Sequence, residues 1–588
     1  MEIRYEVGLS APHTHLFDVR LTVVGIGSSQ LVFQFPSWTP GSYLIREYVQ
    51  HVQDVSAADV NGHPVVVTQI DKRSFGAAPK DGFLALSYRV YAHELSVRTN
   101  HFDDTHALIV GAATFFTVQG YEDHPLTVEI KPPAGWGVET TLPPVADTPN
   151  TWRADNFDHL VDSPIDCAQH ENENFVVLGV PHRFVVWGRG NYDLKKLRID
   201  CAKIVEHAAA IFGKTLPYDR YLFVLQAISG ARGGLEHKNC CVLGWHPNKF
   251  APQKQYEQFL RLVAHEHFHV WNIKRIRPKS LGPFDYGVEN YTRMLWLHEG
   301  GTVYYEGLVP VRAGVITGAT WLADLADSIQ KLDATPGRKH MSMADSSFNA
   351  WTKLYRPTEH SRNNTVSYYL KGELVCFCLD WEIRRNTENQ RSLDDVMRAL
   401  YAATYPDLPG YEEDEFAKIV TQATGVHVED FLRRFVDSTE ELPLEQALSW
   451  YGLSLSRTWT EEAAVERGAW LGIQLESASS TNRLKVTSVD EGSPAMMGGI
   501  YAGDELLAVD GFRVDRAALT DRAKITDPGT VSTFTVFRRD MLREITVTWG
   551  SPPLDKVMVK PRANANEIEK SRCRSLVGQD LFNSVSPL

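Results

Sequence analysis

The sequence predicts a multidomain protein in which a mixed α+β domain lies between two β domains. Three observations lead to this fold class. The chain has 588 residues, whereas a single hydrophobic core stops growing at about 250–300 residues. Residues 1–165 and 465–551 contain short apolar runs separated by turn-forming residues, which is typical of strands. Residues 166–460 carry apolar residues three and four positions apart, which is typical of helices.

The N-terminal domain, residues 1–165, is expected to be all-β. Segments such as "HLFDVRLTVVGI" and "FLALSYRVYA" alternate or run apolar over short stretches. Gly, Pro, Asn and Asp separate these segments, and no long helical period occurs.

The second domain, residues 166–460, is expected to begin as α+β and to end as a bundle of helices. A helix is predicted over 192–214, and buried strands are predicted over 220–228 and 240–247. Further helices are predicted at roughly 253–273, 290–308, 319–332, 365–385, 393–403, 412–423 and 428–437.

The last part of the chain is expected to be a β domain, residues 465–551, followed by a tail, 552–588. The domain contains strand-like segments and one or two short helices. The tail opens with "SPP" and is polar and charged, so we expect it to be loosely held.

The overall composition excludes several classes of partner. The net charge of -13 and the pI near 5.9 argue against nucleic acid and against anionic membranes. No stretch reads as a signal peptide or a membrane span. The seven cysteines include neighbours too close for an easy bridge, which predicts buried thiols in a reducing compartment. We therefore expect a cytoplasmic protein, unless a leader has been lost.

The stretch "HEHFHVWNIKRIRP", residues 265–278, predicts a metal site. On a helix, His265 and His269 share one face, whereas His267 lies about 200° round from His265 and points away. Two imidazoles on one helix face, with Glu266 between them, form the HExxH pattern. In this pattern the histidines bind one Zn²⁺ and the glutamate acts as a general base toward water.

A third ligand is expected from a later helix, because catalytic zinc keeps three protein ligands and one open position. The segment "MLWLHEGGTVYYEGL" places Glu299 on a helix that can return antiparallel to the first. Glu306 and, less favourably, His298 are the alternatives. Zinc is favoured by this ligand set, although cobalt or manganese would also fit it.

The two motifs together resemble the PDZ-containing glycyl aminopeptidases, which are thermolysin-like zinc metallopeptidases with a glutamate as third ligand. "HEHFHVWNIKRIRP" and "NYTRMLWLHEGGTVYYE" carry the resemblance, and residues 35–52 and 95–113 share it. "HEGG" departs from relatives that more often have an aromatic residue after the first glycine. The resemblance implies a thermolysin-like catalytic domain, Glu299 as a ligand, and a zinc aminopeptidase that prefers N-terminal Gly or Ala.

The segment "ISGARGGLEHKNCCVL", 228–243, is the candidate substrate-binding edge. Gly233 and Gly234 allow another backbone to approach closely, so a peptide can be held as an added strand. "GGLEH" resembles the G-x-M-E-N motif of aminopeptidase N, which implies that Glu236 binds the free amine of the substrate. His237 replaces the asparagine of that motif, although "GGLEH" is usual among the glycyl aminopeptidases.

The segment "NNTVSYYLKGELVCFCLDWE", 363–382, resembles the Tyr-x-Lys-Gly stretch of aminopeptidase N-like enzymes. The resemblance implies that the hydroxyl of Tyr369 stabilises the oxyanion of the transition state. Its neighbour Tyr368 remains an alternative. Asp285 and Asn272 are candidates to support the metal ligands.

The segments "AWLGIQLE" and "VTSVDEGSPAMMGGIYAGDELLAVDGFRV" resemble a PDZ domain. The resemblance implies a peptide-binding loop at Leu471, Gly472 and Ile473 and a C-terminal peptide as ligand. The chain's own ending, 586–588, has a sequence of this ligand type, although a frayed end is the preferred interpretation.

Two alternatives to the aminopeptidase remain: an inactive peptide-binding scaffold and a metalloendopeptidase. A scaffold should have lost a ligand, the general base or the amine-binding residue, and all are present. An endopeptidase would not need Glu236.

Overall fold

The computed structural model describes residues 1–27, 29–406, 410–460, 468–476 and 484–582. Two compact units make up the chain, and each is described separately below. The first comprises residues 1–292, 305–316 and 394–424, and the second comprises 293–304, 317–393 and 425–588.

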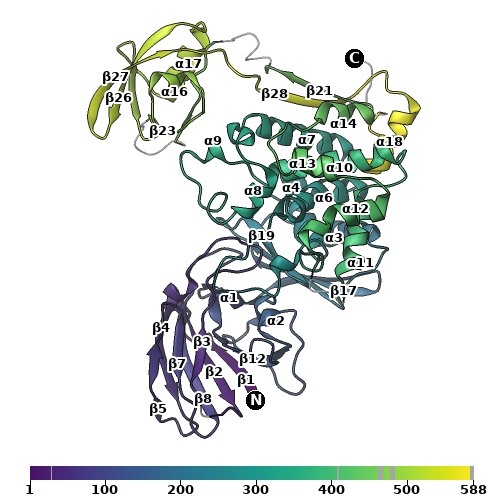
Figure 1. Ribbon diagram of the computed structural model, residues 1–588. Helices are drawn as coiled ribbons and strands as arrows, with labels where there is room; N and C mark the ends of the chain where they lie inside the picture. The colour runs from purple at the N-terminus through teal and green to yellow at the C-terminus, as the bar shows by residue number, and fades with distance from the viewer. Residues whose placement is uncertain (28, 407–409, 461–467, 477–483, 583–588) are drawn as a thin grey trace. The chain divides into compact units, whose positions relative to one another are not determined.

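The first unit begins with a β-rich domain, as predicted (Figure 1). Its strands alternate between buried and partly exposed residues, and Ile3, Tyr5 and Val7 of the first strand all lie in the core. The largest sheet runs in the order β14 (Thr151–Ala154), β12 (Leu126–Lys131), β1 (Glu2–Gly8), β2 (Leu16–Val24), β8 (Phe83–Tyr91), β4 (Val52–Ala58) and β5 (Pro64–Val65).

Two smaller sheets and two short helices complete this domain. One sheet runs β13 (Gly137–Glu139), β15 (Ile165–Ala168), β10 (His106–Ile109) and β9 (His101–Phe102). The other runs β11 (Thr117–Val118), β3 (Leu31–Gln34), β7 (Ser74–Ala77) and β6 (Val67–Gln69). The helices are α1 (Gly111–Thr114) and α2 (Phe157–Val161).

A five-stranded sheet positions the candidate site within the first unit. Its order is β16 (Glu171–Val177), β17 (Val180–Gly188), β18 (Tyr221–Ala227), β20 (Cys240–Trp245) and β19 (Gly233–Glu236). The predicted strands over 220–228 and 240–247 are thus β18 and β20, which are parallel and almost fully buried. The glycine-rich β19 pairs antiparallel with β20 and forms the edge of the sheet.

The helix that carries the HExxH pattern is shorter than predicted. Helix α4 (Gln253–Phe268) packs against β19 and β20 through an apolar face that includes Phe259, Leu260 and Val263. The prediction extended it to residue 273, which is wrong, because Ile273 has a φ of 102°, a backbone conformation incompatible with a helix. The other helices that lie wholly or partly in this unit are α3 (Leu194–Ile211), α6 (Gly300–Arg312), α11 (Leu393–Thr404) and α12 (Phe416–Thr424).

The second unit combines the predicted helical part and the predicted C-terminal β domain. Its helices are α5 (Leu295–His298), α7 (Gly318–Asp333), α8 (Met343–Phe348), α9 (Ser361–Asn364), α10 (Leu370–Asn386), α13 (Glu429–Phe435) and α14 (Leu444–Trp450). The C-terminal sheet runs β22 (Ile473–Leu475), β23 (Leu484–Val489), β24 (Glu505–Val509), β26 (Val531–Arg538) and β27 (Met541–Thr548), with β25 (Phe512–Arg513) on β24. Helices α16 (Pro494–Gly498) and α17 (Arg516–Ile525) cover it.

The tail is not loosely held over its described part, which corrects the prediction. Strand β28 (Lys556–Pro561) pairs antiparallel with β21 (Leu453–Thr458) (Figure 1). Helix α18 (Glu567–Val577) follows, begins with a capping box at Asn566 and buries Cys573, Leu576 and Val577. These three residues lie on one face of α18, so a polar composition still permits packing. Residues 586–588, the potential peptide ligand, lie outside the described residues.

The seven cysteines are all buried, unpaired thiols. Within the described part of the chain, no helix combines the length and apolar character that a membrane crossing requires.

Candidate active site

Helix α4 presents His265 and His269 to each other across one turn. Their Nε2 atoms are 3.1 Å apart. The Nδ1 atom of His265 lies 2.8 Å from the Glu306 carboxylate, and that of His269 lies 2.8 Å from the backbone carbonyl of Asn272. Each Nδ1 therefore carries the proton, because both of these partners only accept hydrogen bonds. The two Nε2 lone pairs consequently face one another, which is favourable only with a cation between them.

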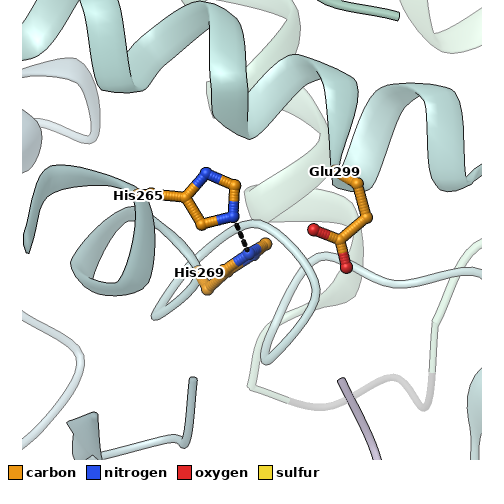
Figure 2. Close-up of side chains that lie close together, drawn as sticks. All are labelled: His265, His269 and Glu299. Atoms are coloured by element: carbon orange, nitrogen blue, oxygen red, sulfur yellow. Dashed lines mark hydrogen bonds between the residues drawn. The ribbon is translucent and has the colours of Figure 1, made fainter. Parts of the chain in front are cut away.

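Glu299 completes the group of potential ligands. One ligand atom from each of His265, His269 and Glu299 lies within 4.8 Å of the other two. Figure 2 shows the Glu299 carboxylate directed toward the two imidazoles. Two neutral imidazoles and one carboxylate are the donor set of a catalytic zinc site, so these residues fit that metal. His265, His269 and Glu299 therefore form a candidate metal site.

The alternative ligands have other positions. Among the described residues, neither Glu306 nor His298 belongs to a group that could hold a metal with both histidines. Glu306 instead accepts a hydrogen bond from His265 and forms an ion pair with Arg261 at 2.8 Å. This contact fixes the orientation of the His265 ring. His267 points away, as predicted, and its Nε2 lies 2.8 Å from the Tyr218 hydroxyl.

Asn272 and Asp285 were the candidates to support the metal ligands. Asn272 contacts His269, whereas Asp285 contacts Trp38 of the N-terminal domain. The Asn272 carbonyl accepts the proton of His269. The Asp285 carbonyl accepts a hydrogen bond of 2.9 Å from Trp38 Nε1. Asp285 thereby anchors a loop of the N-terminal domain to the segment that follows α4.

Glu266 is buried beside the two histidines and has the properties of a general base. Burial raises the pKa of its carboxyl group to about 7, although His265 and His269 act in the opposite direction. A base with a pKa near the working pH is effective in proton transfer. Gly234 leaves room for this side chain, since a Cβ there would lie 2.2 Å from Glu266 Oε1.

Glu236 lies next to Glu266 and His269. One ligand atom from each of Glu236, Glu266 and His269 lies within 4.8 Å of the other two. Two carboxylates this close favour a cation between them, and the ammonium group of a peptide has the required charge.

Gly41 of the N-terminal domain forms one wall around Glu236, a contact that the sequence motifs did not indicate. A Cβ at Gly41 would lie 2.6 Å from both carboxylate oxygens of Glu236 and 2.7 Å from Leu235 Cδ1. Its φ of +82° is also a conformation that favours glycine. The only signal in the sequence was the segment "FPSWTPGSYLIREYVQHV", which shared the family resemblance.

A buried ion pair supports the residues around Glu236. Lys274 Nζ lies 2.7 Å from Asp162, which also contacts His237 Nδ1 at 3.2 Å. Burial alone would raise the pKa of Asp162, but Lys274 and then His237 outweigh it and hold this pKa below its usual range. His237 therefore belongs to the framework beneath Glu236.

We expect Lys274→Met to destabilise the protein by about 3–5 kcal/mol, because it leaves the Asp162 charge buried without its partner. The pKa of Asp162 is lower in the folded protein than in the unfolded chain. The ion pair therefore stabilises the folded protein at pH values above the unfolded pKa, and this stabilisation is lost as the pH falls. The wild type should therefore lose stability in acid more steeply than the variant. Thermal unfolding at several pH values measures both effects.

The exposed ion pair of Lys72 and Glu47, with a separation of 2.6 Å, provides the matched control. Lys72→Met should cost at most about 1 kcal/mol. Equal costs at the two positions would contradict a structural role for Lys274.

The two candidate tyrosines differ in their surroundings. Tyr368 is fully buried, whereas Tyr369, at the start of α10, is only partly buried. Burial and then the nearby Glu299 carboxylate raise the pKa of Tyr369 well above its usual range. Tyr369 therefore lies near Glu299 and keeps its proton, which a hydrogen-bond donor requires.

Tyr369→Phe should lower kcat by about 10²–10³-fold with little change in KM, as for the removal of one oxyanion donor. Tyr368→Phe is the matched control, and its kcat should be nearly that of the wild type. Steady-state kinetics on a glycine anilide distinguish the two. The reverse order of effects would assign the donor to Tyr368.

The predicted peptide-binding loop of the C-terminal domain is held by backbone hydrogen bonds. The carbonyls of Leu471 and Gly472 accept from the N–H groups of Ala495 and Asp490 at 3.0 and 2.8 Å. Because a trans peptide directs its N–H opposite to its carbonyl, the N–H groups of Gly472 and Ile473 point away from these partners. This orientation suits the capture of a carboxylate.

Comparisons with known proteins match three parts of the chain. The Peptidase M61 N-terminal domain matches residues 4–169, the M61 glycyl aminopeptidase model matches 258–375, and a PDZ domain matches 469–548. The crystal structure of an aminopeptidase N family protein from Idiomarina loihiensis is 28% identical, with a TM-score of 0.90, and covers 98% of this chain and 100% of that chain.

Two further likenesses are partial. An M1 zinc metallopeptidase from Deinococcus radiodurans, 16% identical with a TM-score of 0.47, covers 75% of this chain and 94% of that chain. A probable periplasmic serine endoprotease DegP-like of Brucella suis biovar 1 (strain 1330) is 32% identical over 118 residues, or 18% of this chain. The chain spans 23% of the length of that curated relative.

Taken with the fold and the cluster of histidines and glutamates, these matches define a metallopeptidase. The chain thus matches both M61 models, at residues 4–169 and 258–375, and the PDZ model at residues 469–548.

Proposed function

We propose that the protein is a zinc-dependent aminopeptidase that removes small N-terminal residues, such as Gly or Ala, from peptides. The observation that carries this proposal is the proximity of Glu236 to Glu266 and His269, with ligand atoms within 4.8 Å of one another. An ammonium group held by Glu236 places only the first peptide bond beside the general base.

The residues divide the chemistry among them. His265, His269 and Glu299 would hold the zinc, which supplies a Lewis acid to polarise the scissile carbonyl and to acidify water. Glu266 takes a proton from the attacking water and passes it to the leaving amine. The hydroxyl of Tyr369 donates a hydrogen bond to the oxyanion, and Glu236 binds the substrate ammonium.

Two observations support the preference for a small first residue. The matched family is described as glycyl aminopeptidase. In addition, the backbone of Gly41 and the side chain of Leu235 pack around the Glu236 carboxylate, which restricts the space beside a bound ammonium.

A panel of Gly, Ala and Leu anilides, with and without a chelator, tests the proposal together with an N-acetylated peptide. We expect turnover that depends on the metal, declines from Gly or Ala to Leu and is lost on acetylation. Cleavage of the acetylated peptide would indicate an endopeptidase. Absence of all turnover in the zinc-loaded protein would favour the peptide-binding scaffold.

A further inference from the structure

Arg98 of the N-terminal domain reaches the edge strand of the catalytic sheet. It lies between β8 and β9, and its Nη2 donates a hydrogen bond of 3.0 Å to the carbonyl of Gly234 on β19. The Arg98 backbone is fixed on both sides. Its carbonyl accepts a hydrogen bond of 2.8 Å from the Tyr48 hydroxyl, and its N–H donates to Ser96 Oγ at 3.0 Å. The guanidinium is thus held at a defined place on this edge.

Most of the hydrogen-bonding capacity of this guanidinium is unused. Arg98 Nε is buried and lacks a hydrogen-bond partner among the residues that the structure describes. Within the same described ranges, no acidic side chain forms an ion pair with Arg98. A guanidinium has five N–H donors in a planar fork, and a buried donor without a partner is costly. The position is therefore prepared for an acceptor that the protein does not supply.

The guanidinium also lies on the side of the catalytic base. Gly234, whose carbonyl it binds, is the residue that leaves room for the Glu266 side chain. An acceptor bound to Arg98 would accordingly lie close to the scissile bond of a substrate.

The hydrogen bond from Arg98 also limits how far a peptide can pair with β19. In the antiparallel pair of β19 and β20, successive residues direct their backbone groups alternately inward and outward. Gly234 faces outward, since its carbonyl binds Arg98, and Glu236 faces outward with it. Consider a peptide that runs antiparallel to β19 and whose ammonium group is bound to Glu236. Its second or third residue then lies opposite Gly234. The carbonyl that would continue the pairing is already occupied.

We propose that Arg98 binds the C-terminal carboxylate of short peptides and so makes dipeptides and tripeptides the preferred substrates. This inference rests on the proposed aminopeptidase function and names its substrate class. The fork of a guanidinium matches a carboxylate in a bidentate pair, which is stronger than a hydrogen bond to a neutral carbonyl. In a longer peptide a neutral carbonyl replaces the carboxylate at this point.

The test compares Gly-Phe with its C-terminal amide, which removes the negative charge and changes little else. In the wild type, amidation should lower kcat/KM about 10–100-fold, the usual effect of losing a charged hydrogen bond. In Arg98→Gln the two peptides should be cleaved at nearly equal rates. Arg98→Lys should give an intermediate ratio, because it keeps the charge and loses the fork. The ratio of kcat/KM on the amide to kcat/KM on the free acid is informative even where the variant is slower on both peptides.

Arg89→Gln is the matched control, because Arg89 is an exposed arginine of the same domain that pairs with Asp54. It should show the amide-to-acid ratio of the wild type. An unchanged ratio in Arg98→Gln, or a ratio near one in the wild type, would overturn the inference.

A binding measurement separates failure of this inference from failure of the proposed function. Calorimetry in a Glu266→Gln background should show tighter binding of Gly-Phe than of its amide, and Arg98→Gln should remove the difference. If the wild type cleaved only acetylated peptides, the proposed aminopeptidase function would be refuted. Equal binding of the two peptides would refute the role of Arg98.

Discussion

Glu266→Gln is expected to lower kcat by about 10²–10⁴-fold, the contribution of a general base, while the protein keeps its zinc. The amide is nearly the same size as the carboxylate and fits the space beside Gly234, but it cannot accept a proton. Kinetics on a glycine anilide, with zinc content measured on the same sample, test both parts of the expectation.

Glu257 lies on the same helix and is also buried, so Glu257→Gln controls for the loss of a buried carboxylate from α4. It should retain turnover. Substantial turnover by Glu266→Gln would refute its role as base, and loss of zinc from that variant would point to a structural role instead.

Glu299→Ala should abolish activity at ordinary zinc concentrations, because it removes one of three metal ligands. Its zinc affinity should fall by more than the roughly 10–100-fold that partners of the ligands contribute. Competition with a chromogenic chelator measures the affinity, and activity should return in part at high zinc concentration.

Glu306→Gln provides the comparison, since Glu306 contacts His265 at 2.8 Å without belonging to the ligand group. Its zinc affinity should fall within the roughly 10–100-fold range of such partners. If Glu306→Gln lost the metal and Glu299→Ala kept it, the assignment of the third ligand would be reversed.

The sequence predicted the parts of the site that depend on local geometry. The helical period alone placed His265 and His269 on one face and turned His267 away. Glu299 was expected within one helix over 290–308, which is wrong, because it lies at the junction between α5 and α6. Glu236 and Tyr369 came from motif resemblance, and their roles stay predictions.

The contributions of the N-terminal domain could not be predicted. Gly41 and Arg98 lie far from β19 in sequence, and no periodicity links them to it. The early end of α4 depends on the positive φ of Ile273, which no residue preference indicated. The packing of the tail also escaped prediction, because composition alone shows neither the pairing of β28 with β21 nor the buried face of α18.

The pairing of β21 with β28 has a consequence for experiments on the PDZ domain. Leu453–Thr458 precedes this domain and Lys556–Pro561 follows it, and the two strands pair along their whole length. The domain is therefore an insertion whose entry and exit are joined at its base. A chain that stops before the PDZ domain also loses β28 and α18, and it exposes the surface of α7 that contacts β28. Replacing the insertion with a short turn between the two strands would remove the PDZ domain, while β21 would still contact α14 and β28 would still contact α7.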